Sequence, residues 1–333
     1  MAKVVATSAF PIDLRPLLGA GIELVEGSLA DATDAEGLIC LLRDRIDDAF
    51  LARAPRLRVV ANYAVGVDNV DVAACARRGV AVTNTPDVLT DATADLTFAL
   101  ILAVARRLRE AEALLRSGRW GSFEPGLLLG VELSGATLGL VGAGRIARAV
   151  ARRADGFGMS VVYTSRRSEL PGARRRSLDE LLGEADFVSL HCPLTPETRG
   201  LIGAAQLRRM KPTAFLINTA RGAICDEEAV AAALAAGTIA GAGLDAFVDE
   251  PRVVPALLAA PNAVLLPHIG SATRKTRSRM AELCALGVRE VLAGRRPPNL
   301  VVPGERAVAR EGATSSEAQP SEVERPSHGE RTK

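Results

Sequence analysis

The chain has 333 residues and lacks the features that mark membrane, metal-binding or secreted proteins. No apolar run reaches the roughly 20 residues that a helix needs to cross a bilayer, so we expect no membrane partner. The segment Met1–Arg15 has no charged stretch followed by an apolar core and a cleavage site, which argues against a signal peptide. The 5 cysteines are scattered and form no Cys-x-x-Cys pair, so we expect no metal site. These absences favour a cytoplasmic protein with reduced thiols.

An excess of charge of either sign is also absent. Lys and Arg together number 41 and Asp and Glu 39, which gives a net charge of +2. This balance argues against a nucleic-acid partner, and a hydrophobic content of 48% excludes disorder as the main state. Only Lys3, Lys211, Lys275 and Lys333 are lysines, so almost all basic residues are Arg. Codon bias explains most of them, and each Arg is therefore judged by its position.

Short apolar runs alternate with helical stretches along most of the chain. Such alternation predicts parallel sheets with helices on both faces, and therefore an α/β fold. The length is sufficient for two such units. The expected strands are Lys3–Thr7, Leu38–Leu42, Leu57–Ala61 and Val80–Val82 in the first unit, and Thr137–Val141, Ser160–Tyr163, Phe187–Leu190, Ala214–Ile217 and Ala240–Gly243 in the second. The sequence thus predicts two doubly wound parallel-sheet domains.

A long apolar helix is expected between the two series of strands. Apolar residues recur at roughly helical spacing over Asp91–Arg116. Thr90 is a suitable N-cap, and Ser117-Gly118 is a helix-stop signal. We expect one continuous helix that packs between the two domains.

A glycine-rich turn follows the predicted strand Thr137–Val141. It reads Gly142-Ala143-Gly144-Arg145-Ile146-Ala147 and opens a helix, which is the context of dinucleotide sites. Gly142 permits the tight turn, and Gly144 lets the backbone approach a pyrophosphate at the helix N-terminus, where Arg145 and Ile146 follow. The third position needs only a small residue, which Ala147 provides. The alternative is a glycine turn without a ligand, but the flanking strands favour a dinucleotide cofactor.

The end of the next strand indicates which dinucleotide is bound. An NAD-selective site places Asp or Glu there to accept hydrogen bonds from the ribose hydroxyls. This sequence has Ser165, Arg166 and Arg167 instead, a hydroxyl and two cations that suit a 2′-phosphate. The alternative is that both Arg side chains are merely solvated. We therefore expect NADP(H), with NAD(H) as the second choice.

Histidine is scarce, since the chain has only 3. His328 lies in a segment poor in large apolar residues and is set aside. His191 and His268 each follow an apolar run. On the residues alone, either can be a structural histidine that is bonded to a backbone carbonyl.

Several ordered motifs resemble the D-isomer-specific 2-hydroxyacid dehydrogenase family. The resemblance extends from about residue 3 to Pro303. Its motifs are Val65-Gly66-Val67-Asp68, the turn at Gly142, Asn218-Thr219-Ala220-Arg221-Gly222, Leu244-Asp245-Ala246-Phe247, Glu250-Pro251 and Pro267-His268-Ile269-Gly270. Within the family, the stretches Asn62–Asn69, Asn84–Asp95 and Leu266–Thr273 are most similar to glyoxylate/hydroxypyruvate reductases. Those reductases often carry a second Trp three residues after the first, whereas here Trp120 is followed by Phe123.

The resemblance implies that Arg221, Glu250 and His268 are the catalytic residues. Arg221 would bind the substrate together with the backbone amides of Val65 and Gly66, and Glu250 would pair with His268, which also lies at the substrate. Reduction of a 2-oxoacid takes a hydride from the nicotinamide and a proton for the carbonyl oxygen, and His is a natural donor near neutral pH. A neighbouring carboxylate favours the protonated ring and fixes its tautomer.

The resemblance also implies further cofactor contacts, of which Cys192 can equally be a small buried side chain. Besides the turn and the residues after it, the implied cofactor-binding set comprises Thr93, Cys192, Pro193, Thr219, Ala220, Arg221, Asp245, His268 and Gly270.

The family fold implies a Rossmann cofactor domain, residues 98–267, inserted in a flavodoxin-like substrate domain made of residues 1–97 and 268–303. The chain would return after His268 through a helix over Arg274–Leu292. Residues 304–333 are rich in Glu, Arg, Ser, Pro and Gly, and we expect a disordered tail there. Because the family is usually dimeric through the cofactor domain, we expect a homodimer that uses Leu100–Leu115 and the loop at Trp120.

The expected function is NADPH-dependent reduction of a small 2-oxoacid: glyoxylate to glycolate, or hydroxypyruvate to D-glycerate. One alternative is another D-2-hydroxyacid dehydrogenase of the phosphoglycerate or phenylpyruvate type. A phosphoglycerate enzyme needs extra cations, and we see no clear cluster near Tyr63–Asn69. The other alternative is a nucleotide-sensing corepressor on the same fold, for which the sequence shows no nucleic-acid-binding or peptide-binding module.

Overall fold

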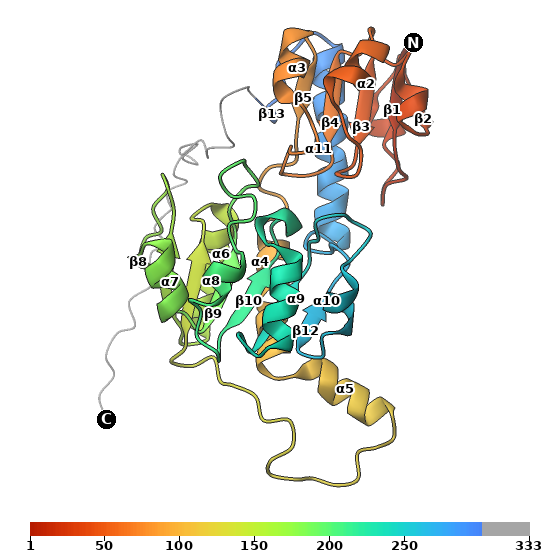
Figure 1. The fold of residues 1–333 in the computed structure, drawn as a ribbon. Coiled ribbons are helices and arrows are strands. Elements are labelled where there is room, and N and C mark those ends of the chain that lie inside the picture. Colours follow the sequence, from red (N-terminus) through yellow and green to blue (C-terminus); the bar gives the residue numbers. More distant parts are fainter. Residues whose placement is uncertain (302–333) are drawn as a thin grey trace, which may run out of the picture.

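The computed structural model describes residues 1–301, and Figure 1 shows that they form two lobes, each built on its own sheet. We call these lobes the six-stranded unit and the seven-stranded unit. The tail expected at residues 304–333 lies outside the described residues.

The six-stranded unit has the strand order β13-β5-β4-β3-β1-β2. All neighbouring strands are parallel except β13, which runs antiparallel to β5. Without β13 the order is 2-1-3-4-5, which is the flavodoxin-like arrangement. The strands are β1 (Ala2–Ala6), β2 (Ile22–Glu26), β3 (Gly37–Cys40), β4 (Val59–Asn62), β5 (Ala81–Thr83) and β13 (Leu300–Val301).

The seven-stranded unit is entirely parallel, with the order β12-β11-β10-β9-β6-β7-β8. Counted from β6 as its first strand, this is the Rossmann order 3-2-1-4-5-6 with one strand added at the end. The predicted fold class is therefore confirmed. The strands are β6 (Thr137–Val141), β7 (Ser160–Thr164), β8 (Arg174–Arg175), β9 (Phe187–Leu190), β10 (Phe215–Asn218), β11 (Gly241–Leu244) and β12 (Ala263–Leu265).

Helices cover both faces of each sheet. The six-stranded unit carries α1 (Arg15–Leu18), η1 (Leu29–Ala32), α2 (Asp48–Arg53), α3 (Val72–Arg77) and α11 (Arg274–Leu292). The seven-stranded unit carries α4 (Thr90–Ala105), α5 (Leu108–Arg116), α6 (Arg145–Gly156), α7 (Leu178–Glu184), α8 (Ala204–Leu207), η2 (Gly222–Ile224), α9 (Glu227–Ala235) and α10 (Pro255–Ala259). The helix expected over Arg274–Leu292 is confirmed, and it packs on β3, β4 and β5.

Alternating burial along the strands explains this layered packing. In β3, Leu38 and Cys40 join the apolar cluster on one face of the sheet, whereas Ile39 joins the cluster on the other face. Both faces of the central strands are thus apolar, as expected for a parallel sheet between two helix layers. Polar functional groups are consequently left to the loops that follow the strands.

The single helix expected over Asp91–Arg116 was wrong, because the structure has two helices, α4 and α5. The break falls at Arg107, whose φ of 53° is left-handed and cannot continue the helix. The apolar side chains of α4 pack against α6, β10 and β11, whereas α5 has no buried residue. Helix α4 therefore covers the seven-stranded sheet instead of lying between the units, and α5 with the chain after it extends away from the body (Figure 1).

Candidate active site

The candidate site lies where loops from both units meet. The loop after β4 in the six-stranded unit carries Val65, Gly66 and Asp68, and the turn after β10 in the seven-stranded unit carries Arg221. The two are joined directly, since Arg221 contacts Asp68. Ligands of doubly wound folds bind at the carboxyl ends of the strands, which is where these loops lie.

His268 and Glu250 form a close pair at this junction. Nδ1 of His268 lies 2.9 Å from both carboxylate oxygens of Glu250. The side chains are 30% and 35% exposed, so a ligand can reach them. Within residues 1–301, Nε2 of His268 has no hydrogen-bond partner and is available to a ligand. Burial alone raises the pKa of Glu250, but hydrogen bonds from His268 and from the amide of Phe247 outweigh it, so this pKa lies below its ordinary value.

The backbone of His268 is held in an unusual conformation. Its φ is +53°, in the left-handed region that few non-glycine residues adopt. The two following amides, of Ile269 and Gly270, donate to the two oxygens of Asp245 at 2.7 and 2.8 Å. Asp245 is almost fully buried, and this burial raises its pKa. Thr93 donates to the carbonyl of Gly270 at 3.3 Å and so ties α4 to the same turn.

The loop that carries Glu250 is fixed to the turn that carries Arg221. Glu250 accepts a hydrogen bond from the amide of Phe247 at 2.9 Å, and Glu227 accepts one from the amide of Val248 at 2.6 Å. A Cβ at Gly222 would lie 2.0 Å from the carbonyl carbon of Phe247, so only glycine permits this approach. Burial raises the pKa of Glu227, which favours its neutral form beside this acidic loop.

Arg221 has three fixed contacts. Its Nε donates to Asp68, with 3.0 Å to Oδ1 and 3.2 Å to Oδ2, and its Nη1 donates to the carbonyl of Ala220 at 2.9 Å. Its Nη2 lies against Gly66, where an added Cβ would be only 1.9 Å away. Asn218 supports the turn, because it donates to the carbonyl of Arg221 and accepts from the amide of Ala220.

The segment Val65–Val67 presents free amide groups beside Arg221. Asn84 donates to the carbonyl of Val65 and Asn62 donates to the carbonyl of Gly66, both at 2.8 Å. In a trans peptide the N–H points opposite to the carbonyl, so the amides of Gly66 and Val67 point away from these Asn side chains. Neither these amides nor that of Val65 donate to any of residues 1–301. Together with Arg221 they suit a carboxylate.

The glycine-rich turn fits the phosphates of a dinucleotide. Gly142 has a φ of +114°, and a Cβ there would lie 2.6 Å from the carbonyl oxygen of His191. Around Gly144, the N-cap of α6, an added Cβ would meet nothing within 4 Å, so the helix end is open. The first turn of α6 has no acidic side chain, and its positive dipole end suits a phosphate. Arg145 begins this helix and forms an ion pair with Asp87 at 2.7 Å.

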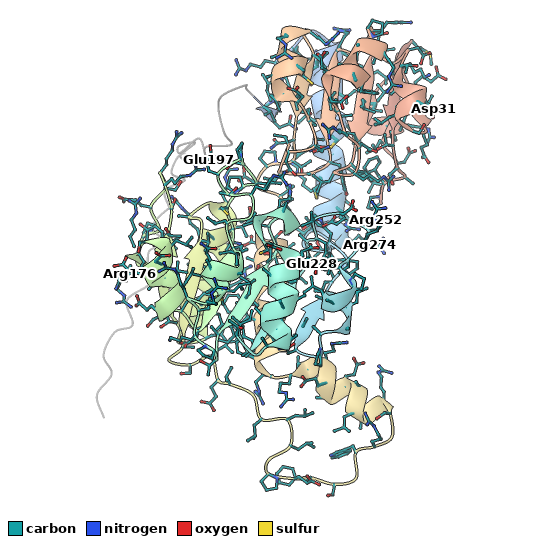
Figure 2. The ribbon with its side chains drawn as sticks, viewed as in Figure 1. Asp31, Arg176, Glu197, Glu228, Arg252 and Arg274 are labelled. Carbon is teal, nitrogen blue, oxygen red and sulfur yellow. The ribbon has the colours of Figure 1, made fainter. Side chains whose placement is uncertain are left out.

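The end of β7 lacks an acidic residue, as the sequence indicates, and is lined by hydroxyl and guanidinium groups. Arg166 lies 3.4 Å from Glu197, and these side chains are 53% and 58% exposed. Figure 2 shows Glu197 at the upper edge of the seven-stranded unit. Arg167 is exposed, and Ser165 accepts a hydrogen bond from the amide of Ser168. Sequence reasoning missed Arg175, which donates to the carbonyl of Ser165 at 2.6 Å.

The remaining predicted cofactor residues line the same edge of the sheet. Cys192 is mostly buried, and burial raises its pKa to about 11, so it is a neutral thiol near pH 7. Pro193 accepts a hydrogen bond from Thr198 through its carbonyl. The hydroxyl of Thr219 lies 3.0 Å from that of Thr97 on α4. His191 lies 2.9 Å from the hydroxyl of Ser189, and burial lowers its pKa to about 4, so this histidine is neutral.

Sequence reasoning overlooked the side chains that support the site. The motifs that carry the family resemblance include Asp68, Asn84 and Asp87, but the sequence alone indicated no role for these side chains. Glu227 was overlooked because an acidic residue in the first turn of a helix needs no other explanation. The best available signal was Asn62, a polar residue that ends a run of apolar strand residues.

Over residues 1–301, no cluster of His, Cys, Asp and Glu could hold a metal ion. No helix in the same range is both long and apolar enough to span a bilayer.

Known proteins resemble this chain over most of its length. Residues 98–270 match the family model described as D-isomer specific 2-hydroxyacid dehydrogenase, NAD binding domain. A glyoxylate reductase of Thermococcus litoralis is 50% identical over 282 residues, which cover 82% of this chain and 85% of that protein. A glyoxylate reductase of Pyrococcus furiosus is 50% identical over 286 residues, covering 83% and 85%.

Solved structures agree with these relatives. A crystal structure of a Thermus thermophilus protein has a TM-score of 0.86 at 50% identity and covers 90% of this chain and 100% of that one. An NADPH-dependent glyoxylate/hydroxypyruvate reductase of Sinorhizobium meliloti, in complex with NADP and malonate, has a TM-score of 0.82 at 35% identity and covers 92% and 99%. The chain belongs to the D-isomer-specific 2-hydroxyacid dehydrogenase family.

Proposed function

We propose that the protein reduces a small 2-oxoacid, glyoxylate to glycolate or hydroxypyruvate to D-glycerate, with NADPH as the reductant and His268 as the proton donor. The observation that carries the proposal is the His268–Glu250 pair at 2.9 Å, which leaves Nε2 of His268 without a partner in residues 1–301. Relatives named glyoxylate reductase, at 50% identity, support this substrate class.

The substrate carboxylate binds between Arg221 and the loop after β4. Nη2 of Arg221 faces this loop, and the amides of Val65 and Gly66 add neutral donors. Charge-assisted hydrogen bonds of this type are roughly twice as strong as neutral ones, so they orient the small anion and place its carbonyl toward His268.

His268 supplies the proton. The carboxylate of Glu250 accepts the hydrogen bond from Nδ1, which keeps the ring oriented and stabilises the positive charge of its protonated form. Nε2 then donates to the carbonyl oxygen as negative charge develops there, and the ring ends neutral. When bound, the reduced cofactor would provide the hydride that the carbonyl carbon requires. One hydride and one proton convert the 2-oxoacid to the 2-hydroxyacid.

The cofactor would lie along the carboxyl edge of the seven-stranded sheet. The amides after Gly142 and Gly144 would hold the pyrophosphate, with Arg145 beside them. Ser165, Arg166 and Arg167 would bind a 2′-phosphate, which supports NADPH over NADH. The Sinorhizobium meliloti reductase, described in complex with NADP, is consistent with this choice.

We further propose a homodimer formed through α5 and the chain after it. Large apolar side chains are exposed there, including Leu115, Trp120, which is 53% exposed, and Phe123, which is 83% exposed. Apolar exposure of this extent on one protruding segment marks an interaction site. Phe123→Ser is expected to shift the mass measured by light scattering from dimer toward monomer, whereas an unchanged mass would contradict this interface.

The domain boundaries and the compartment complete the proposal. Residues 1–97 and 268–303 would form the substrate domain and residues 98–267 the cofactor domain, with catalysis between them. All 5 cysteines are free thiols, which suits the reducing cytoplasm.

An assay of the purified full chain tests the function. Glyoxylate, hydroxypyruvate, phenylpyruvate and 3-phosphohydroxypyruvate are each offered with NADPH and with NADH, and oxidation of the reduced cofactor is followed by absorbance. The expected result is the highest kcat/KM with glyoxylate or hydroxypyruvate and NADPH. A preference for phenylpyruvate or the phosphorylated acid would contradict the substrate class. Absence of turnover with every acid would favour the sensor alternative.

A further inference from the structure

Asp68 makes a direct ion pair with Arg221 between the two units, and the proposed function gives it no role. Asp68 follows β4 of the six-stranded unit, and Arg221 follows β10 of the seven-stranded unit, 153 residues later. The contact is bifurcated, because one Nε donor lies within 3.2 Å of both carboxylate oxygens. The side chains of Arg221 and Asp68 are only 21% and 31% exposed, respectively. This burial distinguishes the pair from the fully solvated ion pairs that contribute little.

The contacts of Arg221 determine which of its donors remain for a ligand. A guanidinium has five N–H groups in a rigid fork. Asp68 takes the one on Nε, and the carbonyl of Ala220 takes one on Nη1. Within the described residues, the two N–H groups on Nη2 and one on Nη1 remain: one N–H of Nη2 borders the Nε edge, and the other points away from Nε. The Nε edge, where a carboxylate would otherwise bind side-on, is occupied.

Gly66 confirms that this orientation is tightly defined. A Cβ at residue 66 would lie 1.9 Å from Nη2 of Arg221 and 2.8 Å from a carboxylate oxygen of Asp68. The guanidinium and the carboxylate thus both pack directly on the same glycine, beside the free amides of the loop. Rotation of Arg221 away from Asp68 would move Nη2 away from Gly66. The ion pair therefore also keeps Nη2 beside the amides of the loop.

We propose that Asp68 is the positioning residue of Arg221: it holds the Nε edge and thereby aims Nη2 at the substrate carboxylate beside the amide of Gly66. The proposal rests on the proposed function, in which Arg221 binds that carboxylate. Because the two residues belong to different units, the carboxylate site is complete only in the relative arrangement of the units seen here. Asp68 thus couples the position of the six-stranded unit to the alignment of Arg221.

A double-mutant cycle tests whether Asp68 acts through Arg221. The variants are Asp68→Ala, Arg221→Lys and the double variant, assayed with glyoxylate and NADPH. We expect Asp68→Ala to lower kcat/KM by about 10- to 100-fold, the range that misplacement of a binding group causes. Lys has no Nε–H for Asp68 to hold, so in the Arg221→Lys background we expect Asp68→Ala to lower kcat/KM by less than threefold.

Two further variants separate positioning from general damage. Asp68→Asn retains an oxygen that accepts from Nε, so it is expected to recover most of the loss in kcat, with the remaining defect in KM. Asp48→Ala removes an exposed partner of Arg78, also at 3.0 Å and in the same unit, and is expected to change kcat/KM by less than twofold. Circular dichroism and melting temperature verify folding of each variant. If Arg221→Lys turns over too slowly to assay, the same four proteins are compared by their Kd for oxamate, an unreactive monocarboxylate, measured by calorimetry.

The possible outcomes are distinct. The positioning role is overturned if Asp68→Ala lowers kcat/KM by the same factor in the wild-type and Arg221→Lys backgrounds. It is also overturned if the loss of kcat/KM in the wild-type background is less than threefold. Equal losses for Asp68→Asn and Asp68→Ala also overturn it, because charge and not hydrogen-bond geometry would then matter. A wild-type protein inactive with every 2-oxoacid would instead refute the proposed function itself.

Discussion

The two ends of the proposed cofactor cleft are built differently. At the proposed catalytic end, each charged side chain has a defined partner: Glu250 contacts His268, Asp68 contacts Arg221, and Asp245 accepts from the backbone after His268. At the other end, after β7, Arg166 lies 3.4 Å from the exposed Glu197, and Arg167 is solvent-exposed. The side chains at the first end are held by hydrogen bonds and ion pairs, whereas the Arg side chains at the second end are mostly exposed to solvent.

The proposed function accounts for this difference. Proton transfer requires a defined distance and tautomer, since small displacements of reacting groups have large effects on rate. Recognition of a 2′-phosphate requires positive charge and donors within reach, which flexible Arg side chains supply. The catalytic end should therefore control kcat, and the other end should control KM for the cofactor.

The largest expected effect is that of removing His268. His268→Ala should lower kcat by about 10²- to 10⁴-fold, because the general acid is lost. The KM for NADPH should change by less than about threefold, since the substitution leaves the glycine-rich turn intact. Steady-state kinetics at saturating NADPH measures both. A kcat within tenfold of the wild type would show that another group supplies the proton.

A smaller and cofactor-specific effect is expected at the other end. Arg166→Ala should raise the KM for NADPH about tenfold and leave the KM for NADH and kcat nearly unchanged, because only NADPH carries the 2′-phosphate. Arg174→Ala is a matched control, since Arg174 is exposed on the neighbouring strand and pairs with Glu184. Equal changes of KM for NADPH and NADH would mean that Arg166 does not bind the 2′-phosphate.

The smallest expected effect is on stability. The pKa of Glu250 is lower in the folded protein than its ordinary value of about 4.3, so its charge stabilises the folded state above that pH. This contribution is lost as the pH falls through the lower, folded value. Glu250→Gln should therefore reduce Tm by about 1–3 °C at pH 7, and the difference should shrink below about pH 4.3.

A control clarifies the stability comparison. Glu112→Gln removes an exposed helical pair with Arg116 and should change Tm by less than about 1 °C at either pH. A Tm difference for Glu250→Gln that grows as the pH falls would reverse the predicted sign and contradict the account of this carboxylate.

Strand positions and the glycine-rich turn were predictable because they depend on local signals. The nine expected strands are all present, with ends shifted by at most two residues. β2 was missed because its half-exposed edge position, with Glu23 and Glu26 in the strand, weakens the apolar run. The break at Arg107 was missed because tertiary packing determines it: α4 buries its apolar residues against the sheet, whereas α5 buries none.

The candidate site was predictable only in part. The resemblance supplied Arg221, Glu250 and His268, and the structure places the last two 2.9 Å apart. The contact of Asp68 with Arg221 joins residues 153 positions apart in different units, and no spacing rule reaches that far. The assignment of NADP(H) rests on the chemistry of Arg166 and Arg167 and stays a prediction.

The most direct test of the central claim is transfer of deuterium from NADPH labelled with two deuterium atoms at C4 of the nicotinamide to glyoxylate. The product is analysed by mass spectrometry for the wild type and for His268→Ala. The account predicts glycolate that carries one deuterium, formed by the wild type at least 100-fold faster than by the variant. Unlabelled glycolate, no glycolate at all, or equal rates for the two proteins would contradict it.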